Sequence, residues 1–419
     1  MELNRRIITS PQIRRGVSIG SAEKISFHTI FLGLYFFTIS LSFLPILENV
    51  SISRILSLLP AGIIMIQFWK WRPNNKKLVF AIITYFSYNV LSYIYSINRV
   101  MTMTRLTMLA MNFALILAVG LMQYNKKEMK FLLKCLANSA WIPTIFYAYN
   151  LTEVLNGERF MLRVDGALFD PNEMCGFFIF SIVYYFDAYL RNGKKRGIVN
   201  ITVYLVVIFL SGSRGGLVAI GISMLVYLFL FLKNTKTPNK HFKLIFITVM
   251  TFIAIIIAFN LMPEDIALRF SVDRVVEDRG TGRFDIWEEI LTKYKEQGLF
   301  KQIFGIGIAT VTNITRKGQF AHNLWVETLM ELGIAGLALT IYFYYIFLKK
   351  TIKEKLNVYT ATFIGYMALS MSLSFASYKP LWTIIMLIII TNRSHMPQKQ
   401  PMNINNLRSG LEATILFED

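Results

Sequence analysis

Two arginines and a histidine stand where an apolar sequence does not ordinarily keep polar side chains. Arg214 lies in IFLSGSRGGLVAIG between two apolar runs, and Arg283 lies in GTGRF directly before an amphipathic pattern. His322 lies near the start of QFAHNLWVETLMELGIAGLAL. Arginine is suited to binding an anion, and a histidine at such a boundary is either structural or catalytic. If the three meet, they form a site for an anion at a membrane boundary.

Two glutamates lie deeper in the segment that His322 opens. Glu327 and Glu331 are four residues apart, so they share one face of a helix. An ionisable group inside a membrane span costs at least about 2.5 kcal/mol on insertion scales, and it therefore faces a polar cavity and has partners. We expect a cationic or hydrogen-bonding neighbour from another helix.

Each of these residues could also have a simpler role. Arg214 could extend to phosphate headgroups, and Arg283 could form an ion pair with Asp285 or Glu289 in water. A single histidine at a membrane boundary is often structural. Each motif taken alone leaves these alternatives open.

The elements that position these residues are apolar segments. The chain has 419 residues, of which 54% are hydrophobic and 14% aromatic, and its mean hydropathy is +0.48. Apolar runs of about 17 to 25 residues are long enough to cross a bilayer, and they recur about twelve times. We predict an all-α integral membrane protein, a single domain over 1–419. Its predicted spans are 25–47, 52–69, 78–97, 106–124, 131–151, 175–190, 198–211, 215–232, 244–262, 322–348, 358–376 and 380–390.

Lysine and arginine predict the orientation of these spans. They gather in every second connection, in KWRPNNKK, NKKEMK, RNGKKR, KNTKTPNKHFK and KKTIKEK. Because cytoplasmic loops accumulate positive charge, both the N-terminal segment 1–24 and the tail 392–419 should be cytoplasmic. The net charge of +19 then belongs to the inner leaflet, and we expect membrane lipid rather than nucleic acid as its partner.

Two outward loops are long, and function should be sought there. The loop 263–321 contains RFDIWEEILTKYKEQGLF, with Phe284, Trp287, Leu291 and Tyr294 at helical spacing. This predicts an amphipathic helix, on the membrane surface or against other helices, with Thr281 as its N-cap. The helix dipole does not favour a cation in its first turn, so Arg283 should have another purpose there.

The second long loop leads into the sixth predicted span through RVDGALFDPNEMCG. Arg163, Asp170, Asn172 and Glu173 in this stretch suggest a substrate-binding surface, and Asp-Pro-Asn also indicates a turn followed by a helix start.

Other motifs carry no chemistry of their own. FGIG at 304–307 lacks the lysine and serine of a phosphate loop. Cys135 and Cys175 are expected to be inert packing residues. No Asp-X-Asp motif or metal-ligand cluster occurs in the outward loops, so we expect no cofactor and no metal.

Four stretches in this order, FDPNEMCG, SGSRGGLVA, GTGRFDIWEEI and AHNLWVETLMELGIAGL, resemble the O-antigen ligase and polymerase family of bacterial membrane glycosyltransferases. The resemblance covers roughly residues 165–340. It implies a GT-C-like fold, a metal-independent reaction and an undecaprenyl-diphosphate-linked oligosaccharide as donor, at the periplasmic face of the inner membrane. By analogy, Arg214 and Arg283 would hold the donor diphosphate, and His322 would orient or deprotonate the acceptor hydroxyl.

Further roles follow from the same resemblance and from the position of the residues. We expect a chain-length regulator and a flippase as partner proteins. The residues expected to contact substrate are Arg163, Asp170, Asn172, Asn323, Glu327 and Glu331.

Three functions remain open, and the sequence favours the first. A polymerase would transfer the glycan to the non-reducing end of another lipid-linked repeat unit, and FDPNEMCG resembles the polymerase branch. A ligase would transfer it to lipid A core. A multi-spanning transporter could use Arg214, Glu327 and Glu331 as a substrate or proton pathway, but it leaves the large outward loop unexplained.

Overall fold

The computed structural model describes most of the chain between residues 24 and 391. The described residues are 24–43, 45–47, 50–72, 75–151, 163–164, 167–168, 170–234, 263–268, 270–271, 282–316, 318–374 and 377–391, with scattered residues between 242 and 260. The expected N-terminal segment up to residue 23, the tail 392–419, Thr281 and most of the predicted span 244–262 lie outside the described residues.

The described chain is helical apart from two short antiparallel ladders. Its α-helices are α1 (Phe27–Phe37), α2 (Ile52–Ile66), α3 (Lys76–Leu91), α4 (Arg99–Gly120), α5 (Lys126–Asn138), α6 (Trp141–Tyr149), α8 (Pro171–Asn192), α9 (Arg196–Leu210), α10 (Arg214–Asn234), α12 (Glu264–Leu268), α14 (Arg283–Lys295), α15 (Leu299–Phe304), α16 (Leu324–Lys353), α17 (Asn357–Leu369) and α18 (Lys379–Ile390). Three 3-10 helices are η1 (Ile39–Phe43), η2 (Phe68–Lys70) and η3 (Val311–Asn313). Strand β1 (Pro45–Leu47) pairs with β2 (Val50–Ser51), and β3 (Arg163–Val164) pairs with β4 (Ala167–Leu168).

The helical class expected from the sequence is confirmed, whereas the number of crossings stays a prediction. Within the described residues, α4, α8, α10 and α16 are long and apolar enough to cross a membrane, and α1, α2, α9 and α18 are shorter apolar helices. The predicted span 131–151 is divided between α5 and α6. The GT-C-like arrangement also stays a prediction.

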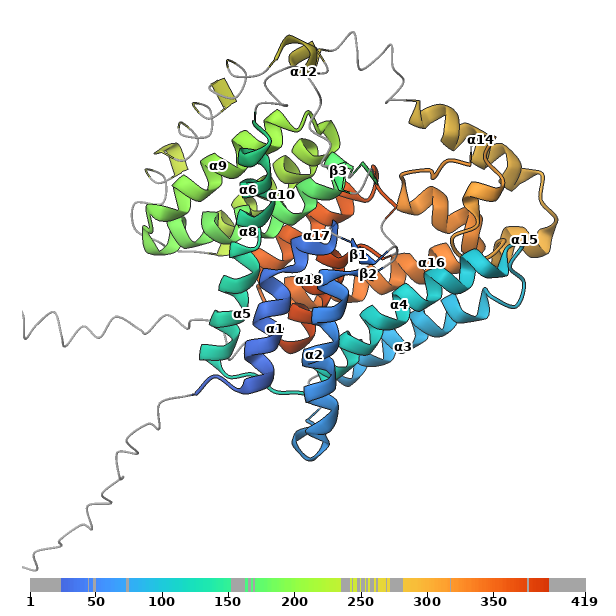
Figure 1. The fold of residues 1–419 in the computed structure, drawn as a ribbon, viewed down its shortest axis with the longest axis horizontal. Coiled ribbons are helices and arrows are strands. Elements are labelled where there is room, and N and C mark those ends of the chain that lie inside the picture. Colours follow the sequence, from blue (N-terminus) through green and yellow to red (C-terminus); the bar gives the residue numbers. More distant parts are fainter. Residues whose placement is uncertain are drawn as a thin grey trace, which may run out of the picture.

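Helix α18 lies in the middle of the molecule (Figure 1). Its side chains from Pro380 to Ile390 are all buried, which explains why the sequence there is apolar on every side. The Trp382 ring lies 5.1 Å from the ring of Phe113 on α4 and 6.1 Å from that of Phe343 on α16. These aromatic contacts join α4, α16 and α18 into one core.

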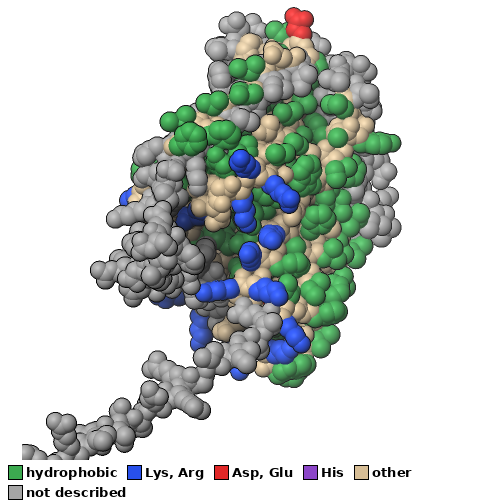
Figure 2. Space-filling model, turned by 90° about the vertical axis from the view of Figure 1, so that its left-hand side faces the viewer, with side chains coloured by type: hydrophobic (Ala, Val, Ile, Leu, Met, Phe, Trp, Pro, Cys, Tyr) green, Lys and Arg blue, Asp and Glu red, His purple; other side chains and the backbone are tan. Residues whose placement is uncertain are grey.

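The exposed basic residues follow the predicted charge pattern. Lys126, Lys127 and Lys130 at the start of α5 and Lys194 and Lys195 before α9 are exposed. Figure 2 shows lysine and arginine side chains gathered on one face of the molecule beside hydrophobic ones. A membrane protein collects such residues on its cytoplasmic side, and the assignment of this face to the cytoplasm stays a prediction.

The segment between α14 and α16 is fixed to a kink in α16. Gly333 has φ 68° and ψ −174° inside the helix, and a Cβ there would overlap the carbonyl of Ile303 at the end of α15. A Cβ on Gly305 would in turn overlap the carbonyl of Glu331, while the Gly307 amide donates to that carbonyl at 2.9 Å. The glycines of FGIG therefore allow two backbones to approach closely.

We predict that Gly333→Ala destabilises the protein, because the left-handed backbone and the Ile303 carbonyl both oppose a Cβ. The expected loss is about 5 °C or more in Tm, measured by thermal unfolding in detergent. Gly221→Ala on α10 is the matched control, since nothing lies within 4 Å of its Cβ position. An unchanged Tm for Gly333→Ala would contradict the close packing of α15 on α16.

Candidate functional site

The start of α8 is tied to the start of α10 by polar contacts. Asp170 is the N-cap of α8, and its Oδ1 accepts from the amide of Asn172 at 2.7 Å and from its side-chain nitrogen at 2.9 Å. The Asn172 Oδ1 accepts from Ser213 Oγ at 2.6 Å, and Ser213 Oγ accepts from the Gly216 amide at 3.1 Å. The helix start expected at Asp-Pro-Asn is therefore confirmed, and it lies against the SGSRGG turn.

Arg214 is the first residue of α10. Gly215 behind it lies so close to α8 and to the segment after α17 that a Cβ would come 2.5 Å from Ser372 Oγ and 3.1 Å from Asn172 Oδ1. Helix N-termini carry partial positive charge and exposed amides, which favour anions and disfavour cations. A guanidinium in this position adds to a field that already attracts an anion.

Arg283 holds the same position on α14. The N-cap is Gly282, with φ 74° and no side-chain hydrogen bond, in place of the expected Thr281. The expected apolar stripe was partly wrong, because Phe284 is 50% exposed and Leu291 37% exposed. The face that packs inward is formed by Ile286, Trp287, Ile290 and Tyr294, against Ile306, Val311, Ala321 and Met330. Helix α14 thus packs against the loop that follows it and against α16, one of the two arrangements expected.

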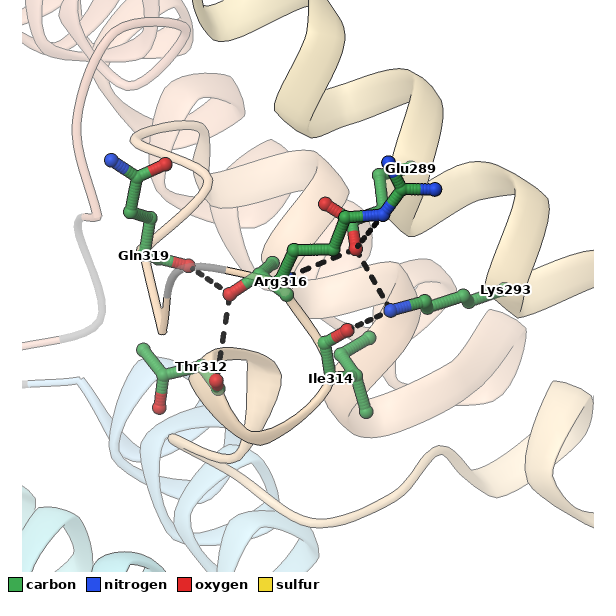
Figure 3. A network of polar contacts seen from close by, with 7 residues as sticks. Glu289, Lys293, Thr312, Ile314, Arg316 and Gln319 are labelled. Atoms are coloured by element: carbon green, nitrogen blue, oxygen red, sulfur yellow. Dashed lines mark hydrogen bonds and ion pairs between the residues drawn. The ribbon is translucent and has the colours of Figure 1, made fainter.

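Beside this packed face, a charged network joins α14 to the loop after η3 (Figure 3). Glu289 Oε1 accepts from Lys293 Nζ at 2.8 Å and from the Arg316 amide at 3.0 Å, and Lys293 also donates to the Ile314 carbonyl. The hydrogen bond from Lys293, with the charges of Lys293 and Arg316, holds the pKa of Glu289 below its usual value. An open cavity of about 720 Å³ lies beside this network; most of its lining residues are charged or polar, and Gly282 also lines it.

His322 is fixed between α14 and α16. Trp287 Nε1 donates to the carbonyl of Ala321 at 2.7 Å, and His322 itself has φ 49°. Asn323 follows as the N-cap of α16, accepting from the amides of Trp325 and Val326 at 3.0 and 3.2 Å. Helix α16 thus begins at Leu324, two residues later than expected, and leaves His322 in the loop before it.

Two charged side chains from different segments act on His322. Burial lowers the pKa of His322, the negative charge of Asp170 raises that pKa, and the positive charge of Arg283 lowers it. Asp170 from the start of α8 and Arg283 from the start of α14 are therefore both near the imidazole. Asn172 and Ser213 connect Asp170 to the turn that carries Arg214.

The two glutamates of α16 have the partners that their burial requires. Ser374 Oγ donates to Glu327 Oε1 at 2.5 Å, and the charge of Arg105 on α4 acts on both Glu327 and Glu331. Glu331 Oε1 also accepts from the Val311 amide at 3.2 Å. Glu331 thus holds the backbone of the segment between α14 and α16 at Val311.

Several residues near the site were not predicted from the sequence. Arg105 Nη1 donates to Ser377 Oγ at 3.0 Å, and its charge also acts on Glu173. The signal was a single arginine in MTMTRLTML, but the predicted span began after it, at Leu106, whereas α4 begins at Arg99. The serines 213, 374 and 377 had no sequence signal of their own.

Some expectations fall outside what the structure describes. Arg163 is placed only as backbone in β3, and its side chain lies outside the description. Among the described residues, no group of three or more histidine, cysteine, aspartate or glutamate side chains is arranged to hold a metal ion.

We predict that His322 titrates below its usual pKa of 6.5, because burial penalises its charged form. Asp170 opposes this shift, so Asp170→Asn should lower the pKa of His322 further, while asparagine still caps α8. NMR titration of histidine-labelled protein, assigned with His322→Asn, measures both values. Glu264→Gln, at an exposed position of α12, is the control and should leave the pKa unchanged. A pKa that rises in Asp170→Asn would contradict the proximity of these two side chains.

Comparison with known proteins supports one family. Residues 199–341 match the family model described as O-antigen ligase, a range that includes Arg214, Arg283 and His322. No curated protein matches the chain. The resemblance is therefore confirmed over residues 199–341, which match this family model and contain three of the four motifs, whereas FDPNEMCG lies outside the matched range.

Proposed function

We propose that this protein is a surface-polysaccharide polymerase. It transfers a glycan from undecaprenyl diphosphate to the non-reducing end of another lipid-linked repeat unit, at the periplasmic face of the bacterial inner membrane. The family match supports a membrane glycosyltransferase of O-antigen assembly. The observation that carries the proposal is the placement of Arg214 and Arg283 as first residues of two helices, with His322 near Arg283.

The two arginines suit a diphosphate leaving group. Each guanidinium can bind two phosphate oxygens, and each helix N-terminus adds partial positive charge. When the bond between the anomeric carbon and the diphosphate oxygen breaks, negative charge grows on that oxygen. Cations already in place would stabilise this charge without rearranging.

His322 suits the role of general base. An imidazole whose pKa is lowered by burial is neutral at neutral pH and can accept a proton. It would take the proton of the acceptor hydroxyl as that oxygen attacks the anomeric carbon. The nearby carboxylate of Asp170 would stabilise the imidazolium that forms.

The glycan needs polar surface around these groups. The open cavity beside α14 is lined by Gly282, which precedes Arg283 in the chain, and it offers carboxylates, an amide and a hydroxyl for sugar hydroxyl groups. The residues that we propose to contact the substrate are Arg163, Asp170, Asn172, Asn323, Glu327 and Glu331. Asn323 and Glu331 would contact the substrate in addition to accepting hydrogen bonds from backbone amides.

The choice of acceptor separates polymerase from ligase. The polymerase is favoured because FDPNEMCG resembles the polymerase branch of the family. A ligase acting on lipid A core is the second candidate. A chain-length regulator and a flippase are the proposed protein partners of the polymerase. No metal is proposed for the reaction.

The direct test incubates purified protein in detergent with one lipid-linked repeat unit. We expect a ladder of products on a gel, unaffected by EDTA. Product that forms only after lipid A core is added would show a ligase. Absence of product with both acceptors would favour the transporter, and activity that EDTA abolishes and a divalent ion restores would contradict metal independence.

We predict that Arg214→Lys and Arg283→Lys each lose most polymerisation, on the order of a hundredfold, because lysine cannot make the two-oxygen contact. Both should insert and melt like the unchanged protein. Product ladders of unchanged length in either lysine variant would refute the role of the arginines.

His322→Ala should also lose transfer but still bind the lipid-linked donor.

A further inference from the structure

An apolar stripe on the outside of the protein runs along α3. Phe80, Ile83 and Val90 on this helix are exposed, and so is Ile94 in the turn that follows it. The spacing of these residues places them on one face of a helix. Helix α3 therefore presents apolar side chains to its surroundings up to the turn that leads into α4.

The neighbouring helix α4 has an apolar outer face of the same kind. It packs against α3, and it is long and apolar enough to cross a membrane. Val100 and Met103 near its start are both exposed, and their spacing places them on one face. Apolar side chains that point out of a membrane-crossing helix face the acyl chains of the lipid. The outer faces of α3 and α4 are therefore expected to contact lipid.

Helix α15 extends this apolar surface beside the α3–α4 turn (Figure 1). The Phe300 ring lies 5.9 Å from the ring of Tyr95 in that turn, and the Ile97 amide donates to the Ile306 carbonyl at 2.9 Å. Helix α15 is described in full, and none of its side chains is buried. Leu299 is 72% exposed and Phe300 57% exposed. Two large apolar side chains thus project from α15 next to the outer faces of α3 and α4.

Aromatic and cationic residues border this surface. The Arg99 guanidinium at the start of α4 lies 5.9 Å from the ring centroid of Tyr93 in the α3–α4 turn, and Lys301 on α15 is exposed. Tyrosine is enriched where a membrane meets water, and long cationic side chains reach headgroup phosphates from there. Because KWRPNNKK before α3 is predicted to be cytoplasmic, the α3–α4 turn is expected at the outward end of the hairpin.

We propose that α15 lies in the outer-leaflet interface of the bilayer, with Leu299 and Phe300 in contact with phospholipid. The surface it continues is that of α4, a helix able to cross a membrane, and the cations beside it suit lipid phosphates. The amphipathic pattern of α14 suggested that helix for the membrane surface. In the structure an apolar face of α14 packs against protein, whereas the apolar side chains of α15 are exposed.

A lipid contact at α15 fixes the depth of the segment that carries His322. The Ile303 carbonyl at the end of α15 lies against Gly333 in the kink of α16. Trp287 on α14 donates to the Ala321 carbonyl directly before His322. The segment between these contacts is held by protein on α16 and by the bilayer at α15. This inference concerns the seating of the segment and does not depend on the reaction.

Spin labels on α15 measure its environment directly. Leu299→Cys and Phe300→Cys each receive a nitroxide, in full-length protein carrying Cys135→Ala and Cys175→Ala, in phosphatidylcholine nanodiscs. Power-saturation EPR compares collisions with oxygen, which dissolves in lipid, and with a water-soluble nickel chelate. We expect oxygen collisions to exceed nickel collisions at both positions, because apolar side chains of an interfacial helix are buried among acyl chains.

Two labelled positions calibrate this measurement. Glu296→Cys, at the exposed C-cap of α14, should give the low oxygen-to-nickel ratio of water, and Leu225→Cys, on the exposed side of α10, the high ratio of the lipid core. The ratios at Leu299 and Phe300 should lie between these two. Neither side chain is buried in the protein, so both variants should melt like the cysteine-free protein, and Phe304→Cys on the same helix repeats the measurement if one does not.

Two results would overturn the proposal. Ratios at Leu299 and Phe300 equal to that at Glu296 would show that α15 lies in water. Low collision rates with both reagents would show that a protein, either a second copy of this chain or another partner, covers α15 in place of lipid. Because the measurement needs no substrate and no turnover, either result would leave the proposed polymerase untouched.

Discussion

The α17–α18 linker holds together the helix ends on which the candidate site depends. Its Ser370 carbonyl accepts from the first amide of α16, Ser372 lies against Gly215 of α10, and Tyr378 binds the first turn of α8. Lys379, which follows the linker directly, donates a hydrogen bond to Ser51, the N-cap of α2. Gathering helix N-termini concentrates partial positive charge at one end of the bundle. That charge is the physical basis for proposing that the protein binds phosphate there.

The buried carboxyl groups of α16 help to fix the segment between α14 and α16. Arg105 acts on Glu327 and Glu331, and Glu331 also accepts from the loop backbone at Val311. The backbone contacts at Gly305 and Gly333 join the same loop to α16. Since Trp287 then binds the carbonyl of Ala321, the position of His322 depends on the packing of α14 against this loop. The loop is thereby a structural support for the candidate base.

Much of the local structure follows from the sequence, because its signals are local. The Asp-Pro-Asn helix start, the helix after GTGRF and the apolar segments all rest on capping, periodicity and hydropathy. The inward face of α14 was only half predicted, since isoleucines 286 and 290 and aromatic residues 284 and 287 offer two overlapping apolar stripes. Arg105 and the linker serines were missed because their role comes from contacts between distant segments. No spacing rule encodes such contacts.

The account depends most on one diphosphate being held by both Arg214 and Arg283 beside His322. A cryo-EM structure with a bound polyprenyl-diphosphate-linked repeat unit tests this directly. We predict diphosphate density within hydrogen-bond distance of both guanidinium groups, with the first sugar facing the imidazole of His322. A lipid diphosphate bound away from either arginine, with His322 facing no sugar, would contradict the account.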